Sequence, residues 1–521
     1  MRRRLLEEKH DYLCFTALAD GSFTLTIPAA VDSTYVEHVS YSTDEGETWV
    51  TTVNDNTEKI ITVNVETGDK VLWKGKGNTY SLSDTVSYSN FTSTTNFEAS
   101  GNIMSLLYED KHYGKHELTR IYTFFDLFYN NTNLQSIDNL KLPATKLAGS
   151  CYSNMFNGCT GLTTIPTNLL PATTLVSNCY NGMFDGCTGL TTIPSTLLPA
   201  TTLANYCYSF MFRGCTGLTT IPTGLLHATN LAQYCYTNMF YGCSGLTSIP
   251  EDLLPATTLA ERCYNYMFSN CTGLTSIPST LLPATTLAQS CYSSMFSYSG
   301  VTSIPSGLLP ATTLAKNCYS SMFYGCTGLT TIQTGLLPAT TLAQSCYSSM
   351  FANSDVTSIP SGLLPATTLA QSCYYRMFYY CIGLTSIPSG LLPATTLATS
   401  CYLSMFHGCT GLTSIPTGLL PATTLAYACY ETMFTVCKNI TRAPNLPATT
   451  LANYCYYEMF EGCGKLNYIR CYATDITATN CTYRWLANVA SSGTFYKKSS
   501  MSSWTRGVDG IPSGWTVYNV S

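Results

Sequence analysis

Residues 172–199 read ATTLVSNCYNGMFDGCTGLTTIPSTLLP, and closely similar stretches precede and follow them. The pair Cys-Tyr marks each copy and recurs every 26 to 28 residues. A fixed period of about 20 to 50 residues is typical of stacked coils rather than of a globule. The sequence therefore predicts a solenoid whose coils begin their Cys-Tyr pairs at Cys151, Cys179, Cys207, Cys235, Cys263, Cys291, Cys318, Cys346, Cys373, Cys401, Cys429 and Cys455.

Within the quoted unit, the apolar residues fall at i, i+1, i+4, i+5, i+8, i+9 and i+12, counted from Leu175. We interpret this spacing as one face of an amphipathic helix over residues 175–187. Thr174 is suited to its N-cap and Gly189 to its C-terminal stop. Residues 190–194 are short and β-branched, which favours a strand. The pattern predicts an α/β solenoid with one helix and one short strand per coil.

Residues 11–80 have another composition, in which Phe23, Leu25 and Ile27 alternate with polar residues between Gly and Asp turns. This alternation predicts a small all-β, sandwich-like domain. We therefore divide the chain into an N-terminal tail (1–10), the β domain (11–80), a connector (81–122), an N-terminal cap repeat (123–150), the solenoid (151–463) and a C-terminal cap (464–521).

The consensus MFxGCTGLTxIPxxLLPATTLAxxCYxxMF resembles the BspA-like leucine-rich repeats of bacterial surface proteins and of some phage-encoded proteins. The resemblance covers about residues 123–486. It implies a leucine-rich-repeat solenoid that serves in attachment at a cell surface or on a virion, without catalysis.

The charge of the chain excludes several classes of protein. With 25 Lys and Arg against 30 Asp and Glu, the net charge is −5, so we expect no nucleic-acid partner. No apolar run approaches the roughly 18 residues of a membrane span. A signal peptide needs an apolar stretch after its first basic residues, but in this chain Glu7, Glu8 and Lys9 come first. We expect an extracellular or virion-associated protein without a recognised signal peptide, and a cell-surface location is the alternative.

Twenty-five cysteines invite a disulfide interpretation, but the number is odd. On a helix Cys179 and Cys187 are about 12 Å apart, and equivalent cysteines on packed helices about 8 to 10 Å apart, which is too far for a bridge. The units at Cys291 and Cys346 lose the second cysteine and keep the first. We predict buried, reduced thiols. There is no CxxC and histidine is scarce, so we expect no metal and no cofactor.

Residues 42–49 read STDEGETW and resemble the Asp-box of sialidases. In that family the box is a structural hairpin turn, and we interpret it so here. A carbohydrate-active enzyme using this N-terminal domain remains the alternative, and it would need a carboxylate pair in a cleft. A weaker alternative is an intracellular thiol or redox protein, which would need a cysteine with a basic, exposed neighbourhood.

Residues 151–454 contain six acidic and six basic side chains, and the chain has none of the common catalytic motifs. We therefore predict no enzyme and assign no catalytic residue. The outer positions of the predicted helices change from coil to coil, through drift on a solvated face or because they recognise a ligand. For the second interpretation, Tyr and Arg are suitable anchors, and the candidates are Arg213, Tyr241, Arg262, Tyr266, Tyr324, Arg376, Tyr379 and His407.

These observations favour a recognition and scaffold protein whose repeats present an extended, neutral surface to a cell-surface glycan or protein. The N-terminal domain would attach to other proteins of a virion or surface assembly. A phage tail or fibre-associated protein and a bacterial surface adhesin are the two forms we expect.

Overall fold

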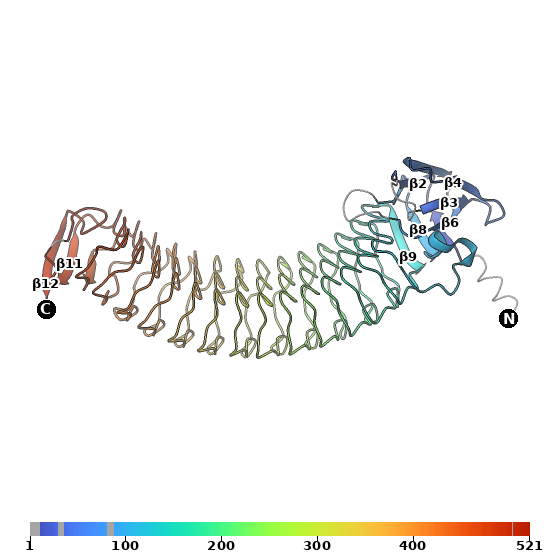
Figure 1. Cartoon of the computed structure of the whole chain (residues 1–521). Coiled ribbons are helices and arrows are strands. Elements are labelled where there is room, and N and C mark those ends of the chain that lie inside the picture. The colour runs from blue at the N-terminus through green and yellow to red at the C-terminus, as the bar shows by residue number, and fades with distance from the viewer. Residues whose placement is uncertain (1–10, 30–35, 81–87, 503) are drawn as a thin grey trace. The chain divides into compact units, whose positions relative to one another are not determined.

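The computed structural model describes residues 11–29, 36–80, 88–502 and 504–521, so the predicted tail (1–10) lies outside the described residues. The chain divides into two compact units (Figure 1). Unit 1 comprises Met1–Ala256 and Cys271–Gly273, with the β domain and the first coils. Unit 2 comprises Thr257–Asn270 and Leu274–Ser521, with the later coils and the C-terminal end.

Two sheets form the β domain, as the alternation of residues predicts. In β2 the side chains of Phe23, Leu25 and Ile27 are buried and those between them are more exposed. The larger sheet has the order β4-β3-β6-β1-β8-β9 and the smaller one β5-β2-β7. The strands are β1 (Leu13–Ala17), β2 (Gly21–Ile27), β3 (Val36–Ser42), β4 (Val50–Val53), β5 (Lys59–Val65), β6 (Lys70–Gly77), β7 (Asn90–Ser93), β8 (Phe97–Asn102) and β9 (Leu134–Lys141).

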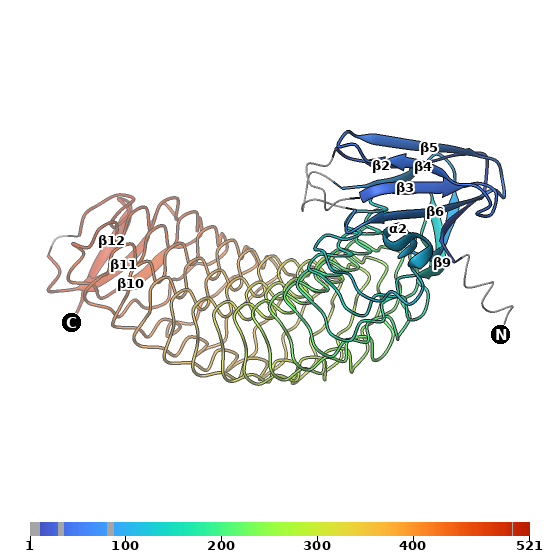
Figure 2. The same ribbon diagram turned by 45° about the vertical axis from the view of Figure 1, so that its right-hand side comes forward.

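The two sheets face one another (Figure 2). Aromatic side chains pack between them. The ring of Phe15 lies 5.5 Å from that of Phe23 and 4.8 Å from that of Phe91, measured between centroids. β7 and β8 lie in residues 81–122, which the sequence analysis assigned to a connector, so the boundary at residue 80 is too early. The same segment contributes α2 (Ser105–Tyr108), which packs on β6, and the 3-10 helix η2 (Glu109–Lys111).

The β domain is joined to the first coils by shared structure. β9 belongs to the predicted cap repeat, yet it pairs in parallel with β8 in the larger sheet. The buried ring of Phe128 stacks on Phe91 at 5.6 Å and on Phe156 of the next coil at 5.5 Å. The β domain therefore covers the exposed apolar end that a repeat array would otherwise present.

The coils contain no α-helix in the described residues, so the prediction of one helix per coil is wrong. Residues 175–187 form a series of tight turns instead. The amide of Cys179 donates to the carbonyl of Val176, that of Met183 to Tyr180 and that of Cys187 to Phe184. Each of these bonds spans three residues, whereas an α-helix needs bonds that span four.

A left-handed backbone at every fourth residue makes these turns possible. In the same coil, Asn178, Gly182 and Gly186 have φ values of 58°, 61° and 70°. A residue in this conformation interrupts a right-handed helix. The apolar pattern repeats every four residues rather than every 3.6, and this was the signal in the sequence that distinguished the turns from a helix.

The remaining amides of the turn segment bond to the next coil. Those of Asn178, Tyr180 and Gly182 donate to carbonyls one coil further along, at 3.1, 3.1 and 2.8 Å. Amides thus alternate between the coil's own turns and the neighbouring coil, which satisfies buried backbone donors in two directions. Both kinds of bond recur within unit 1 and within unit 2.

Residues 190–194, which were predicted as a strand, do not form one and make only isolated backbone hydrogen bonds to the preceding coil. The amide of Thr191 donates to the carbonyl of Thr163 in the preceding coil at 3.2 Å, and its hydroxyl donates to the same oxygen at 3.4 Å. The proline that follows in most units cannot donate a ladder hydrogen bond. The threonine hydroxyls therefore bond to the backbone of the neighbouring coil.

Inward side chains form columns. In unit 1, Tyr152, Tyr180 and Tyr208 stack at 5.9 Å between ring centroids. In unit 2, Tyr319, Tyr347 and Tyr374 do so at the same spacing. Stacked rings of this size bury large apolar areas, so each coil is stabilised mainly by its neighbours.

Residues 464–521 form a different structure at the end of unit 2. β10 (Tyr468–Cys471), β11 (Gly493–Lys498) and β12 (Trp515–Val520) make a parallel sheet. The buried indole of Trp485 stacks on Tyr456 and donates from Nε1 to the carbonyl of Gly510 at 2.9 Å. The large aromatic side chains thus cover the last coil.

Candidate binding surface

The turn segments present a surface that we call the turn face. It consists of the outward residues at positions −1, +2, +3, +6 and +7 from the first cysteine of each coil. Positions −1, +3 and +7 are the left-handed ones. Several carry aromatic side chains with a large exposed fraction, among them Tyr266 (40%), Tyr298 (51%) and Tyr380 (41%).

The structure brings some of the predicted binding residues together. Tyr379 contacts both Arg376 and His407 in unit 2. Its pKa is raised mainly by burial, with a smaller contribution from Tyr324. The other four do not join them. Arg262 and Tyr266 lie in an earlier coil of unit 2, and Arg213 and Tyr241 lie in adjacent coils of unit 1.

We call Tyr375, Arg376, Tyr379, Tyr380 and His407 the Arg376 cluster. The guanidinium carbon lies 4.9 Å from the ring centroid of Tyr375 and 4.8 Å from that of Tyr379. The imidazole of His407 stacks on Tyr379 at 4.9 Å, and Tyr380 meets Tyr379 edge-on at 4.6 Å. Sequence reasoning did not name Tyr375 or Tyr380, although both lie beside named positions.

The cluster has two buried nitrogen atoms without a partner, Nε of Arg376 and Nδ1 of His407. Burial lowers the pKa of His407, and the positive charge of Arg376 lowers it further. The imidazole is therefore mostly neutral near pH 7. Burial raises the pKa of Tyr379, which keeps its hydroxyl protonated.

Unit 1 has a groove of about 380 Å³ on its turn face, lined by Tyr88, Phe125, Asp126, Tyr129, Asn154, Asn157, Asn181, Asp185, Phe210 and Arg213. Here the arginine is compensated, because Nε of Arg213 donates to Oδ1 of Asp185 at 3.0 Å and a second nitrogen bonds Oδ2. Burial raises the pKa of Asp185, and Arg213 partly opposes the rise.

Asp126 is the unusual residue of this groove. It is 7% exposed, and its Oδ1 has no hydrogen-bond partner. Burial raises its pKa to about 7, and Asn154 opposes the rise. Its backbone is left-handed, with φ 55°, which Asp and Asn tolerate better than most residues. No sequence pattern distinguishes Asp126, because its burial comes from neighbouring coils.

The repeats match a known family. A family model described as a BspA type leucine rich repeat region (6 copies) matches residues 126–277, 204–308, 236–385 and 311–431. These matches extend from residue 126 to residue 431, more than half of the 521 residues. The chain belongs to the BspA-type leucine-rich-repeat family. No curated protein and no solved structure matches the chain.

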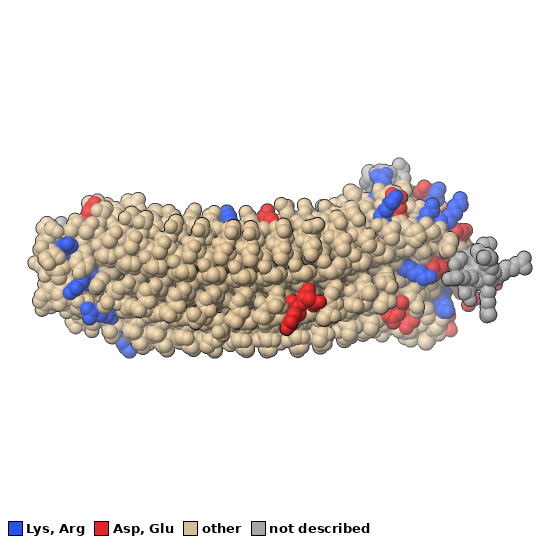
Figure 3. Space-filling model, turned by 90° about the horizontal axis from the view of Figure 1, so that it is seen from below, with Lys and Arg blue, Asp and Glu red and all other residues tan. Residues whose placement is uncertain are grey.

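Membership of the BspA-type family indicates a repeat-based surface or recognition protein. The BspA-type array is nearly neutral on the side seen in Figure 3, whereas charged side chains gather over the β domain. In the parts of the chain that the structure describes, no helix has the length and hydropathy needed to cross a bilayer.

All 25 cysteines of this BspA-type chain are free and buried. Burial raises the pKa of Cys207 and of Cys437 to about 12. The reduced state agrees with the prediction, but the distance argument behind it is wrong because there are no packed helices. Rings of adjacent coils are only about 5.5 to 5.9 Å apart, a spacing at which equivalent cysteines could be bridged.

The Asp-box residues form a structural turn between β3 and β4. The carboxylate of Asp44 accepts hydrogen bonds from the hydroxyl of Ser42 at 2.7 Å and from the amide of Thr48 at 2.9 Å. Together with the hydroxyl of Thr48, these bonds lower the pKa of Asp44 to about 2. The indole of Trp49 donates to the carbonyl of Gly46. The hydrogen bonds of Asp44 that the structure shows all serve the turn.

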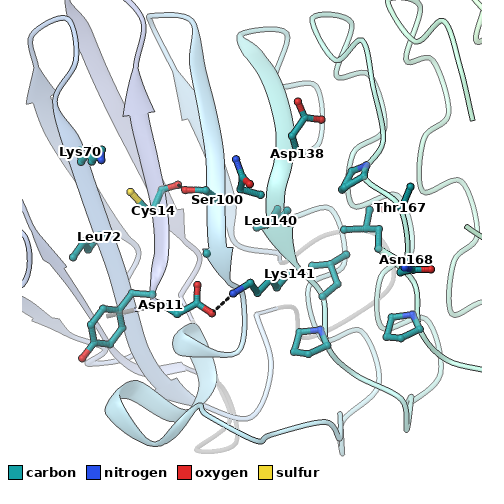
Figure 4. A pocket seen from close by; sticks show the side chains of 18 of the residues that line it. Asp11, Cys14, Lys70, Leu72, Ser100, Asp138, Leu140, Lys141, Thr167 and Asn168 are labelled. Atoms are coloured by element: carbon teal, nitrogen blue, oxygen red, sulfur yellow. Dashed lines mark hydrogen bonds and ion pairs between the residues drawn. The ribbon is translucent and has the colours of Figure 1, made fainter. Parts of the chain in front are cut away.

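A larger groove, of about 930 Å³, lies between the outer face of the β domain and the first coil (Figure 4). β1, β6, β8 and β9 contribute Cys14, Lys70, Ser100 and Asp138, and the coil contributes Pro166, Thr167, Asn168, Leu169 and Pro171. Lys141 and Asp11 form an ion pair of 2.8 Å at its edge. None of the predicted binding residues lines it, because the groove depends on contacts between distant segments.

Proposed function

We propose that this protein is a non-enzymatic recognition and scaffold protein that attaches to a cell-surface glycan or protein through the turn face of its repeats. The observation that carries the proposal is the Arg376 cluster. It combines an arginine, three tyrosines and a histidine on one surface. Tyr and Arg are the residues most enriched at the energetic centres of interfaces.

The backbone supports the same conclusion. Arg376 and Tyr380 have left-handed φ values of 54° and 54°, in place of the serines, asparagines and glycines that most coils use there. A left-handed residue other than glycine costs about 1 to 2 kcal/mol. The left-handed backbone recurs in every coil, so what distinguishes this coil is the size and chemistry of the side chains that it carries at these positions.

The proposal also covers the role of the β domain and the kind of assembly to which the protein belongs. The β domain covers one end of the array, and charged side chains gather over it in the view of Figure 3. We propose that it attaches to other proteins of a virion or of a surface assembly. A phage tail or fibre-associated protein is our first choice, and a bacterial surface adhesin is the second.

A carbohydrate-active enzyme remains the alternative, but its site would lie in the unit 1 groove rather than at the Asp-box. Asp44 of the Asp-box is used by its turn. Asp126 and Asp185 do line one groove, and burial raises the pKa of Asp126 to about 7, so only about half of this carboxyl is ionised at neutral pH. Asp185 is held by Arg213, which leaves the pair without an unengaged carboxylate to act as nucleophile or base.

Binding of the purified chain to glycan arrays and to intact bacteria tests the proposal. The test variant combines Arg376→Ser and Tyr380→Asn. The two flanking coils carry Ser349 and Ser404 at the position of Arg376. At the position of Tyr380 they carry Asn353 and Gly408. The control is Lys316→Gln. It also removes a positive charge, and glutamine is the residue at this position in both flanking coils. We expect binding by wild type and control and a loss of at least tenfold in the variant.

Two results would contradict this proposal. Equal binding by all three proteins would remove the Arg376 cluster from the recognition surface. Release of reducing sugar from any bound glycan would show an enzyme, and Asp126→Asn would then report whether the unit 1 groove is responsible.

A further inference from the structure

Arg213 and Arg376 both pack on aromatic rings of the turn face, but they differ in their charge balance. Arg213 packs against Phe210 at 4.8 Å and is neutralised by Asp185. Arg376 packs against two tyrosines, and no ion pair joins it to a carboxylate of the described residues. His407 is mostly neutral near pH 7, so Arg376 supplies the positive charge of its cluster.

The surroundings of Arg376 make this charge more available to a ligand than an ordinary surface arginine is. Rings on two sides restrict the side chain, so less rotamer freedom is lost when a ligand binds. Its Nε is buried without a partner, and the side chain as a whole is only partly exposed, so the guanidinium is partly desolvated. A partly desolvated cation also interacts more strongly with an anion than one in bulk water does.

The chemistry of the cluster selects the kind of ligand. A guanidinium presents a planar pair of donors that matches a carboxylate. A single cation is too little for a nucleic acid, whose binding requires several phosphate contacts. The partly exposed ring of Tyr380 offers an apolar surface to the C–H face of a sugar ring. The hydroxyl groups of the tyrosines in the cluster can form hydrogen bonds with sugar hydroxyls.

We infer that the Arg376 cluster binds a carboxylate-bearing sugar, such as a uronic or sialic acid residue of an acidic glycan. This inference rests on the proposed function and names the ligand class of the same site. The carboxylate pairs with Arg376, and the sugar ring packs on Tyr380.

The decisive experiment changes the ligand rather than the protein. Wild type is titrated with oligogalacturonate and with sialyllactose, and with the same compounds after each carboxyl group has been reduced to a primary alcohol. We expect at least one acidic compound to bind about 10 to 100 times more tightly than its reduced form. Because wild type is used throughout, a folding defect cannot produce this difference.

Variants then locate the effect. Arg376→Ser should reduce the affinity for the acidic compound to that for the reduced one, and Arg376→Lys should retain only part of the preference because lysine lacks the planar fork. Lys316→Gln, which removes the same charge from another coil, should leave the preference unchanged. Thermal unfolding of each variant shows that it is folded.

The outcomes separate this inference from the proposed function. Equal affinity for acidic and reduced glycans would overturn the acidic ligand and leave glycan recognition standing. Binding to bacteria but to no glycan would overturn the inference and favour a protein receptor. Binding to neither would overturn both.

Discussion

The thiol of Cys215 donates a hydrogen bond to the carbonyl oxygen of Phe184 in the preceding coil, with 3.1 Å between Sγ and O. The second cysteine of other coils makes the same contact, as Cys187 does with Phe156. Ser299 and Ser354 occupy this position in the two coils without the cysteine, and their hydroxyls contact the thiol of the following coil at 3.6 Å. The position therefore requires a small donor rather than a disulfide.

We predict that Cys215→Ser changes the free energy of unfolding by less than about 0.5 kcal/mol, because serine is native at this position in two coils. Cys215→Ala removes the donor and leaves a small void, at a cost of about 1 kcal/mol. Urea unfolding of both variants checks this. A larger loss for serine than for alanine would contradict the assigned hydrogen bond.

The cysteines should react only after unfolding. Their burial and raised pKa values keep the thiolate scarce and inaccessible in the folded protein. Intact-mass measurement after alkylation should show almost no addition in native buffer and 25 additions in denaturant without reductant. Because equivalent cysteines in adjacent coils are close, a much smaller number in denaturant would reveal bridges along a column.

Val436 should destabilise the folded chain through its backbone conformation. This β-branched residue has φ 62°, where the neighbouring coils carry Gly408 and Gly462. We expect Val436→Asn to raise the free energy of unfolding by about 1 kcal/mol, because asparagine tolerates a left-handed backbone. Gly186→Ala should lower it by a similar amount, since a Cβ there meets nothing closer than 3.7 Å and only the backbone is strained. Thermal midpoints of both variants test this pair.

Asp126 should make stability depend on pH. Its pKa is raised from 3.8 to about 7 in the folded chain. Between these values the folded carboxyl retains a proton that the unfolded chain has lost. The stabilisation is complete below about pH 4 and disappears as pH rises through 7. Asp126→Asn should therefore be more stable than wild type at pH 8, by about 1 to 3 kcal/mol, and similar to it at pH 4. Melting curves that differ equally at both pH values would refute the raised pKa.

Phe128 should couple the β domain to the first coil. The side chain is fully buried, and its ring contacts Phe15, Phe91 and Phe156. Phe128→Ala should cost about 3 to 5 kcal/mol and expose the β domain to limited proteolysis. Phe351→Ala in unit 2 is the control, and it should leave the β domain protected. Protection of the β domain in both variants would show that Phe128 is not the coupling residue.

The sequence by itself determined the repeat, the apolar positions of each coil, the family and the structural role of the Asp-box. These follow from local patterns: the Cys-Tyr period and the alternating residues of β2 are visible in one dimension. The turn segment was predicted wrongly. The apolar residues counted from Leu175 repeat every four residues, and the helix prediction takes this for a period of 3.6. The left-handed backbone of Asn178, Gly182 and Gly186 excludes the helix.

Only the tertiary structure decided where the amides of the turns find their partners and which outward side chains meet. The amide of Tyr180 donates to Cys207 one coil away, and no local pattern encodes the distance between coils. Arg376 and His407 are 31 residues apart in sequence, and they share Tyr379 because adjacent coils stack in register. The partly desolvated charge of Arg376 and the raised pKa of Asp126 likewise arise from burial by neighbouring coils. Burial is a property of the stack, so a single repeat does not reveal it.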